Sequence, residues 1–469
     1  MGLVICLGVI GSASSLEGKD FPKIRIARDG RGFVTQAGKP FVPFGVTYYR
    51  PGTGWAPQVW KQFDTEATRR DFARMKELGV NCVRVFLSFG SFYHAPGVLD
   101  TNGLAKFDQF LSIAEDAGIY VHPTGPDLWE GPPEWPLGGV EDEKTLSALE
   151  KFWKLFAARY RGRNVIFAYD LRNEPAVGWD GLEEPWNSWL ADKYKTIENL
   201  NIAWAGQKAA ATFGSIPVPP KKDAPCDRKL LDFQGFREHL ANEWTRRQVA
   251  AIRTADPEAL VTVGLVQWSV PSLLPGDLST YSGFRPAQQA RYLDFLEMHF
   301  YPLLDGGYRY KDAQSETGNL AYLESVLRGT GPPGKPLVLA EFGWYGGGKP
   351  RFNNGSFPAA TEVQQAQYNR KVVETSMGFA CGWLNWGFYD QPEATDCSEL
   401  TGLVTTDGKV KEWGSAFKKL ATSLHGNSGE RKPRGSRPKM NWDACLSNIK
   451  SEQDFLKEYI TAFSQNKSH

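Results

Sequence analysis

The sequence predicts an α/β fold, a (β/α)8 barrel, because one order of elements recurs along the chain: a helix, a glycine and an apolar strand. Residues 64–79 carry apolar side chains at helical spacing, and Gly79 stands where the helix would end. The apolar run 80–87 that follows is typical of a buried strand. The same order returns in residues 103–117 and 119–124. Helices that alternate with apolar strands indicate parallel strands joined by crossover helices.

Eight such strands can be counted, near residues 41–47, 80–87, 119–124, 165–171, 259–265, 294–299, 336–341 and 381–386. Helical patterns lie between them, near residues 64–78, 103–117, 143–161, 233–255, 318–328, 361–377 and 411–423. The helix after the fifth strand is short or missing. Eight parallel strands with interleaved helices close most naturally into a barrel. A doubly wound open sheet is the alternative, but no Gly-x-Gly-x-x-Gly pattern follows the first strand.

Three regions follow from this pattern: a possible signal segment at 1–18, the barrel at 19–424, and a linker with a C-terminal helix at 425–469. The stretch 23–36 predicts a hairpin that closes the bottom of the barrel. Residues 176–232 form a long insertion after the fourth strand, and their tryptophans favour an ordered lid. The final helix, entered near Ser451, has an apolar stripe that we expect to pack against the barrel.

Composition limits the partners of the protein. The 54 basic residues nearly balance the 53 acidic ones, whereas nucleic acids and anionic membrane surfaces select a basic excess. The 16 Trp, 17 Tyr and 28 Phe residues supply flat apolar rings that suit the faces of sugars. The apolar N-terminus, followed by small residues, resembles the end of a secretory signal. We therefore expect a secreted or periplasmic protein, with a cytoplasmic location as the alternative.

Polar or aromatic side chains follow seven of the eight predicted strands, at the point where each strand ends. In a barrel these carboxyl ends meet at one mouth, which is where the chemistry of such folds takes place. Such a concentration of polar groups is difficult to explain by structural needs alone. The set consists of Thr47, Arg84, His122, Asn173, Glu174, His299, Tyr301, Glu341 and Trp386.

Two glutamates in this set have the properties that glycoside hydrolysis requires. One carboxyl group must protonate the leaving oxygen, and the other must attack the anomeric carbon or activate water. Glu174 and Glu341 follow strands four and seven, whose ends face each other across the mouth. Each could instead be a structural ion-pair partner, but both come directly from an apolar strand.

The chain resembles glycoside hydrolase family 5 and its superfamily of cellulases and β-mannanases. Asn173-Glu174-Pro175 is similar to the acid/base motif of that superfamily, and Ala340-Glu341-Phe342-Gly343 to its nucleophile motif. The resemblance covers roughly residues 23–423, so it implies that the barrel is a retaining β-glycosidase domain. It further implies that oligo- or polysaccharides with β-linkages are the substrates. The other active-site positions of the family are matched by Arg84, His122, His299, Tyr301 and Trp386.

The resemblance also gives the supporting residues their expected roles. Arg84 and Tyr301 would bond Glu341 and keep it ionised, while Glu174 in a partly dry cleft would have a raised pKa. Asn173 would hold the sugar 2-hydroxyl, and Trp386 would form the apolar floor under the sugar. The two histidines, His122 and His299, would bind hydroxyls or orient Glu174, or else be core residues.

The choice of substrate is less determined. The third strand ends in a Pro- and Gly-containing segment with Trp129, unlike the plainer cellulase pattern, and Trp344 follows the seventh strand. We expect both tryptophans to bind substrate. Residues 189–204 are similar to a stretch of the family 42 β-galactosidases. Large loops around the mouth favour a pocket, so an exo-acting β-galactosidase or β-mannosidase is the first alternative.

Two further alternatives belong to other classes. A barrel that binds carbohydrate without cleaving it would not need both glutamates with their Arg and Tyr partners. A metal-dependent hydrolase would need clustered ligands, and the six histidines include no His-x-His. We therefore expect neither a metal nor another cofactor.

Overall fold

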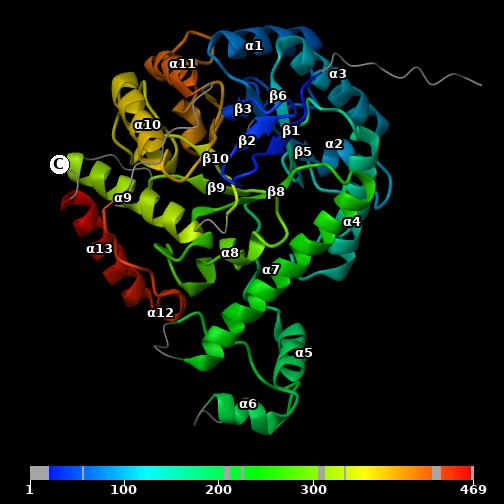
Figure 1. Cartoon of the computed structure of the whole chain (residues 1–469), viewed down its shortest axis with the longest axis vertical. Coiled ribbons are helices and arrows are strands. Elements are labelled where there is room, and N and C mark those ends of the chain that lie inside the picture. The colour runs from blue at the N-terminus through cyan, green and yellow to red at the C-terminus, as the bar shows by residue number, and fades with distance from the viewer. Residues whose placement is uncertain are drawn as a thin grey trace, which may run out of the picture.

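The computed structural model describes residues 21–54, 58–204, 212–222, 227–304, 312–331, 334–424 and 435–465. Eight parallel strands close into a barrel in the order β10-β11-β4-β5-β6-β7-β8-β9 (Figure 1). Each strand overlaps one of the eight predicted segments, so the predicted fold is confirmed. The strands are β4 (Phe44–Thr47), β5 (Cys82–Ser88), β6 (Tyr120–Asp127), β7 (Tyr169–Asn173), β8 (Val261–Leu265), β9 (Leu296–Phe300), β10 (Leu337–Phe342) and β11 (Trp383–Asn385).

Helices surround the barrel and begin where their sequences provide a cap. Aspartate side chains accept a hydrogen bond from first-turn backbone N–H groups of five of them, α1, α3, α4, α7 and α9. The segment after β8 has a single short helix, as predicted. The helices are α1 (Thr65–Glu77), α2 (Phe89–Phe92), α3 (Thr101–Ala117), α4 (Glu143–Tyr160), α7 (Arg228–Ala255), α8 (Pro286–Gln289), α9 (Ala313–Thr330), α10 (Glu362–Ser376) and α11 (Glu412–Leu424).

A small antiparallel sheet closes the bottom of the barrel. The predicted hairpin is formed by β1 (Ile24–Ile26) and β2 (Phe33–Thr35), and β3 (Pro40–Phe41) adds a third strand. The ring of Phe33 lies 5.0 Å from that of Phe167 and 5.1 Å from that of Phe295. Because these two residues lie just before β7 and β9, the contact seals the amino-terminal end of the barrel.

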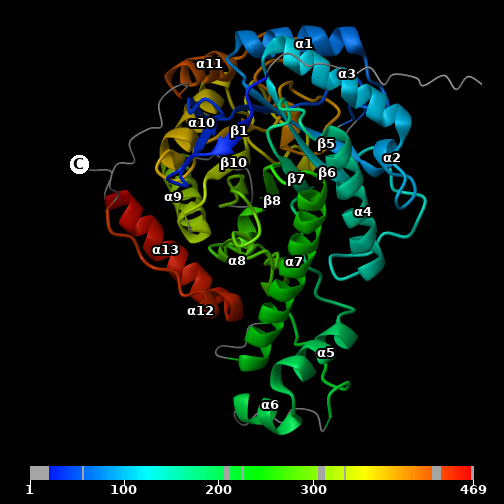
Figure 2. The same cartoon turned by 45° about the vertical axis from the view of Figure 1, so that its right-hand side comes forward.

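The insertion after β7 forms an ordered arm rather than a lid. Its helices α5 (Glu183–Tyr194) and α6 (Ile197–Ala203) lie at the end of α7, away from the barrel strands, in both views (Figures 1 and 2). Trp186 stacks on Trp189 at 5.6 Å and on Trp204 at 6.3 Å between ring centroids. These tryptophans pack on α7, so the described part of the insertion is ordered, and the prediction of a lid is wrong.

The C-terminal region packs against the barrel, as expected. It consists of α12 (Trp442–Ser447) and α13 (Ile449–Gln465), and α13 lies along α9 (Figure 2). Tyr459 donates to the Glu324 carboxylate at 3.0 Å, and Arg437 donates to the same oxygen at 2.9 Å. The helix starts two residues before the predicted Ser451. The predicted signal segment and most of the linker lie outside the described residues.

No helix in the described part of the chain is both long and apolar enough to cross a membrane.

Candidate active site

The mouth of the barrel brings together side chains that are far apart in the sequence. Glu341 lies on β10, His299 lies on β9, and Glu174 directly follows β7. One carboxylate oxygen of each glutamate and a ring nitrogen of His299 lie within 4.8 Å of one another. The closed barrel therefore places both predicted catalytic carboxyl groups in a single cluster at its carboxyl end.

Glu341 is held by two donors. Nη1 of Arg84 donates to Oε1 at 2.5 Å, and the Tyr301 hydroxyl donates to Oε2 at 2.9 Å. Burial raises the pKa of Glu341, while the charge of Arg84 and the hydrogen bond from Tyr301 act against this rise. Both oxygens thus face donors, an arrangement that orients the carboxylate and favours its ionised form.

Arg84 is wholly buried and connects three side chains of the site. Besides Glu341, its guanidinium donates through Nη2 to Oδ2 of Asp170 at 3.0 Å and to Oδ1 of Asn173 at 2.8 Å. Burial lowers the pKa of Arg84, but the carboxylates of Glu341 and Asp170 raise it by more, so the cation persists. Arg84 therefore fixes the end of β7 relative to Glu341.

Glu174 has an unusual backbone and an unusual side-chain environment. Its φ is 46°, in the left-handed region that residues other than glycine rarely adopt, and its N–H donates to the Gly264 carbonyl at 2.9 Å. Its side chain keeps 29% of its surface exposed. Burial raises the pKa of Glu174 to about 7, with Arg84 opposing the rise and Asp127 adding to it. Glu174 can therefore both hold and release a proton near neutral pH.

His299 lies between the two glutamates. Its Nδ1 is 3.0 Å from Oε1 of Glu174 and 3.5 Å from Oε1 of Glu341. Burial lowers the pKa of His299, which favours the neutral imidazole. The ring fits against Gly264 on β8, where a Cβ atom would lie only 2.9 Å from ring atoms Cε1 and Nε2. Glycine at this position is thus needed for the placement of His299.

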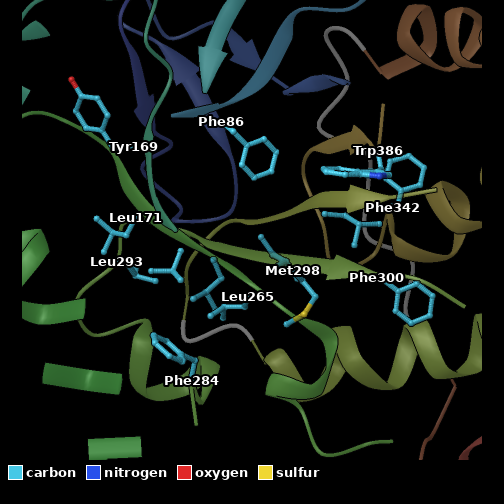
Figure 3. Close-up of a cluster of buried hydrophobic side chains, with 14 of the residues drawn as sticks. Phe86, Tyr169, Leu171, Leu265, Phe284, Leu293, Met298, Phe300, Phe342 and Trp386 are labelled. Atoms are coloured by element: carbon cyan, nitrogen blue, oxygen red, sulfur yellow. The ribbon is translucent and has the colours of Figure 1, made fainter. Parts of the chain in front are cut away.

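Aromatic side chains gather near the carboxyl ends of β5, β6 and β11. Trp386 is 6% exposed, and its indole N–H donates to the Ser398 hydroxyl at 2.6 Å. Phe86 meets Trp386 edge to face at 6.0 Å, and both rings are labelled in Figure 3. Phe86 meets Trp129 in the same way at 5.9 Å. Trp129 is half-buried, in agreement with a place at the mouth. Trp386, Phe86 and Trp129 therefore form one continuous aromatic cluster.

Comparison with known families agrees with this geometry. The cellulase model of glycosyl hydrolase family 5 matches residues 34–391. The chain belongs to glycosyl hydrolase family 5. Membership in this family supports the prediction that the chain is an O-glycoside hydrolase with a (β/α)8 barrel.

Curated relatives of this family 5 chain fall into two groups. Beta-galactosidase Bga of Halorubrum lacusprofundi is 24% identical over 247 residues, which cover 45% of the chain and 34% of that protein. A probable mannan endo-1,4-beta-mannosidase A of Aspergillus flavus is 24% identical over 276 residues, or 48% of the chain and 69% of that protein. The family 5 chain thus spans about a third of the curated β-galactosidase it matches.

Solved structures share the fold of this family 5 chain. The structure of GH5_18 from Streptomyces cattleya in complex with GlcNAc has a TM-score of 0.59 at 16% identity, and the alignment covers 90% of the chain and 92% of that protein. An exo-beta-1,4-mannosidase from Opitutaceae bacterium strain TAV5 has a TM-score of 0.59 at 19% identity, covering 86% and 63%.

Two predicted binding residues of the family 5 chain lie away from the mouth. His122 is wholly buried, and its nitrogens contact Ala168 and Glu297, so the prediction of a substrate ligand is corrected to a core histidine. Trp344 is 1% exposed, and its ring packs on Tyr345 and Tyr368. Its position after β10 is as predicted, but its side chain turns into the loop rather than toward a substrate.

Two groups of side chains in the family 5 barrel have the composition of a metal site: Glu174 with His299 and Glu341, and His122 with Asp170 and Glu297. In both groups the ligand atoms already take part in hydrogen bonds with protein partners, among them Arg84.

Sequence reasoning missed several polar residues that support the site. Asp170 accepts from Arg84, from the Thr124 hydroxyl at 2.9 Å and from the Gly264 N–H at 2.8 Å. The side-chain amide of Gln267 holds the backbone of Tyr301 by two hydrogen bonds. It accepts from the Tyr301 N–H at 2.7 Å and donates to the Tyr301 carbonyl at 3.0 Å. One sequence feature could have indicated this network: Asp170 is a charged residue within an apolar strand, and a buried charge requires a partner.

Proposed function

We propose that the chain is a retaining β-glycosidase in which Glu341 is the nucleophile and Glu174 the general acid/base. The separation of the two carboxyl groups carries this proposal. Retaining enzymes hold these groups about 5 to 5.5 Å apart, whereas inverting enzymes leave about 6.5 to 9.5 Å for a water molecule. An oxygen of Glu174 lies within 4.8 Å of one of Glu341, which agrees with direct attack on the sugar.

The reaction then proceeds in two displacements. Glu341 attacks the anomeric carbon while Glu174 transfers its proton to the leaving glycosidic oxygen, and a glycosyl ester forms on Glu341. In the second step Glu174 takes a proton from water, the water oxygen attacks the anomeric carbon, and the ester bond breaks. The pKa of about 7 for Glu174 suits both steps at neutral pH.

Arg84 also prepares Asn173 for the substrate. Because the guanidinium donates to Oδ1 of Asn173 at 2.8 Å, the amide NH2 group is left to donate to a sugar hydroxyl. A donor at this position suits the 2-hydroxyl, whose hydrogen bond strengthens in the transition state. Trp386 and Trp129 would bind the apolar faces of the sugar rings.

The substrates we propose are β-linked oligo- or polysaccharides of the cellulose or mannan type. The alternative is exo-action on β-galactosides or β-mannosides, favoured by curated relatives named β-galactosidases and by the exo-mannosidase of similar fold. A panel of aryl β-glycosides, β-glucans and β-mannans separates these possibilities. Release of single sugars from chain ends supports exo-action, and random shortening of polymers supports endo-action.

The assignment of roles is tested with Glu341→Ala and Glu174→Ala, with Glu243→Ala, a half-buried residue on the outer helix α7, as the control. Both site variants should lose at least about 1000-fold in kcat, and the control should keep wild-type activity. Azide should restore Glu174→Ala on an activated aryl glycoside, with release of the β-glycosyl azide. First release of the α-anomer from a β-glycoside by the wild type contradicts retention.

A barrel that only binds carbohydrate remains the alternative of another class. Sugars would then protect the fold against heat, while no substrate of the panel is cleaved.

We also propose that residues 1–18 direct export, on the basis of their apolar and small residues. Fractionation of expressing cells tests this point, since a full-length protein that stays in the cytoplasm contradicts it.

A further inference from the structure

A series of buried charges extends from the mouth into the barrel. Glu341 pairs with Arg84 at 2.5 Å, and Arg84 pairs with Asp170 at 3.0 Å. Below them His122 pairs with Glu297 at 2.6 Å, and both of these side chains are wholly buried. The proposed mechanism uses Glu341 and Arg84 but gives no task to the His122–Glu297 pair.

The contacts of His122 indicate that both ring nitrogens carry a proton. Nδ1 lies 2.9 Å from the Ala168 carbonyl oxygen, which can only accept a hydrogen bond. Nε2 lies 2.6 Å from Oε1 of Glu297, and a carboxylate is also an acceptor. Two acceptors on one imidazole fit an imidazolium ion that donates to both Ala168 and Glu297.

Glu297 lies where it could compete for Arg84. Carboxylate oxygens of Glu297 and Asp170 lie within 4.8 Å of each other, and Oδ2 of Asp170 is itself 3.0 Å from Nη2 of Arg84. Within the described residues, Oε2 of Glu297 and Nε of Arg84 have no hydrogen-bond partner. An unpaired buried anion beside a guanidinium with a free donor would attract it strongly.

We propose that His122 is a positioning residue of the glycosidase reaction, which as an imidazolium holds Glu297 and so leaves Arg84 to Glu341. This inference rests on the proposed function. The charged or titratable groups around His122 come from several strands: Arg84 on β5, Asp170 on β7 and Glu297 on β9, with Cys82 lower on β5. The rings of Phe167 and Phe295 flank the imidazole at 5.6 and 6.3 Å and exclude water from the pair.

Loss of the imidazolium should raise the pKa of Glu341. In His122→Gln, Glu297 would draw the guanidinium of Arg84 away from Glu341. The acid limb of kcat/KM, which reports ionisation of the nucleophile, should then move up by about one pH unit. Activity on that limb falls about tenfold, because the ionised fraction falls tenfold for each pH unit below the pKa.

The double variant His122→Gln/Glu297→Gln provides the decisive comparison, since it removes both the competing anion and the cation that holds it. We expect its acid limb to return to within about 0.3 pH units of the wild type, and its activity to exceed that of His122→Gln. Losses that simply multiply in the double variant indicate a purely structural role and overturn the proposal. Exposed His239→Gln serves as the control and should leave the profile unchanged.

A measurement on the wild type keeps the proposal testable if the variants fold poorly. In protein labelled with 15N-histidine, both nitrogens of His122 should show imidazolium shifts at pH 7.5. A neutral tautomer with one bare nitrogen overturns the proposal. A wild type without glycosidase activity contradicts the proposed function, whereas an active wild type with an unshifted His122→Gln contradicts the role of His122 alone.

Discussion

Gly264→Ala is the most direct test of how the barrel positions its acid/base. A methyl group at residue 264 would lie 2.9 Å from Cε1 and Nε2 of His299 and 3.1 Å from Oδ2 of Asp170. Neither neighbour is free to move outward, because both are wholly buried. The imidazole must therefore shift, and its contact of 3.0 Å with Oε1 of Glu174 will lengthen or break.

The size of the effect follows from these contacts. Adding a methyl group to a packed interior costs about 1–3 kcal/mol of stability. A lost hydrogen bond to an ionisable group costs about 1.5–3 kcal/mol, which corresponds to a fall of about 10- to 100-fold in kcat if the bond operates in the transition state. We expect both effects, with KM changed less than kcat.

The assay is steady-state hydrolysis of the best aryl glycoside together with the thermal midpoint. Gly343→Ala, at the end of β10, is the matched control, since its nearest new contact is 3.6 Å, an ordinary packing distance. Wild-type kcat in Gly264→Ala would refute the reasoning, because it would mean that His299 contributes nothing through its contact with Glu174. An equal loss in Gly343→Ala would also refute it.

Three further changes have defined outcomes. Tyr301→Phe removes the 2.9 Å hydrogen bond to Glu341, so kcat/KM should fall about 10- to 100-fold and its acid limb should move up, as a pH–rate profile will show. The alkaline limb should lie near pH 7, where Glu174 loses its proton. The pKa of Glu174 is higher in the folded protein than the unfolded value of 4.5, so the free energy of unfolding falls as pH rises from about 4.5 to about 7. Glu174→Gln removes this loss. In urea titrations the variant should be more stable than wild type by at most about 3 kcal/mol at pH 8, and equally stable at pH 4. Lys411→Met leaves the carboxylate of Asp390 buried without its cation, so urea denaturation should show a loss of about 3–5 kcal/mol.

The barrel and the two glutamates could be predicted because both depend on local patterns. Each strand is an apolar run preceded by a helix, and closure of eight parallel strands follows from their number. The backbone just beyond such a run lies at the mouth, which is why the positions of Glu174 and Tyr301 could be predicted. Their hydrogen-bond partners on neighbouring strands depend on the pairing register of the strands, which cannot be read from the sequence.

The errors have the same origin. His122 and Arg84 are paired in register across β5 and β6, yet Arg84 reaches the mouth and His122 bonds Glu297 below it, since side-chain length and partner decide the level. Trp344 follows its strand as expected, but its ring packs on the rings of Tyr345 and Tyr368 and is therefore buried instead of facing water. Nothing in the sequence shows in which direction an inserted arm leaves the barrel, so the lid could not be distinguished from an arm.

Helix α7 packs on both the arm and the barrel, and the buried side chains of these two parts belong to one continuous hydrophobic cluster. Its first turns carry Phe233 and Phe236, which contact Trp186 of the arm, whereas its later turns pack on α4 of the barrel. Because this one helix of 28 residues provides packing surface to both parts, loosening of either part removes contacts from α7. The arm and the barrel are thus expected to melt in one cooperative transition, and an arm excised without α7 would lack the surface on which it folds.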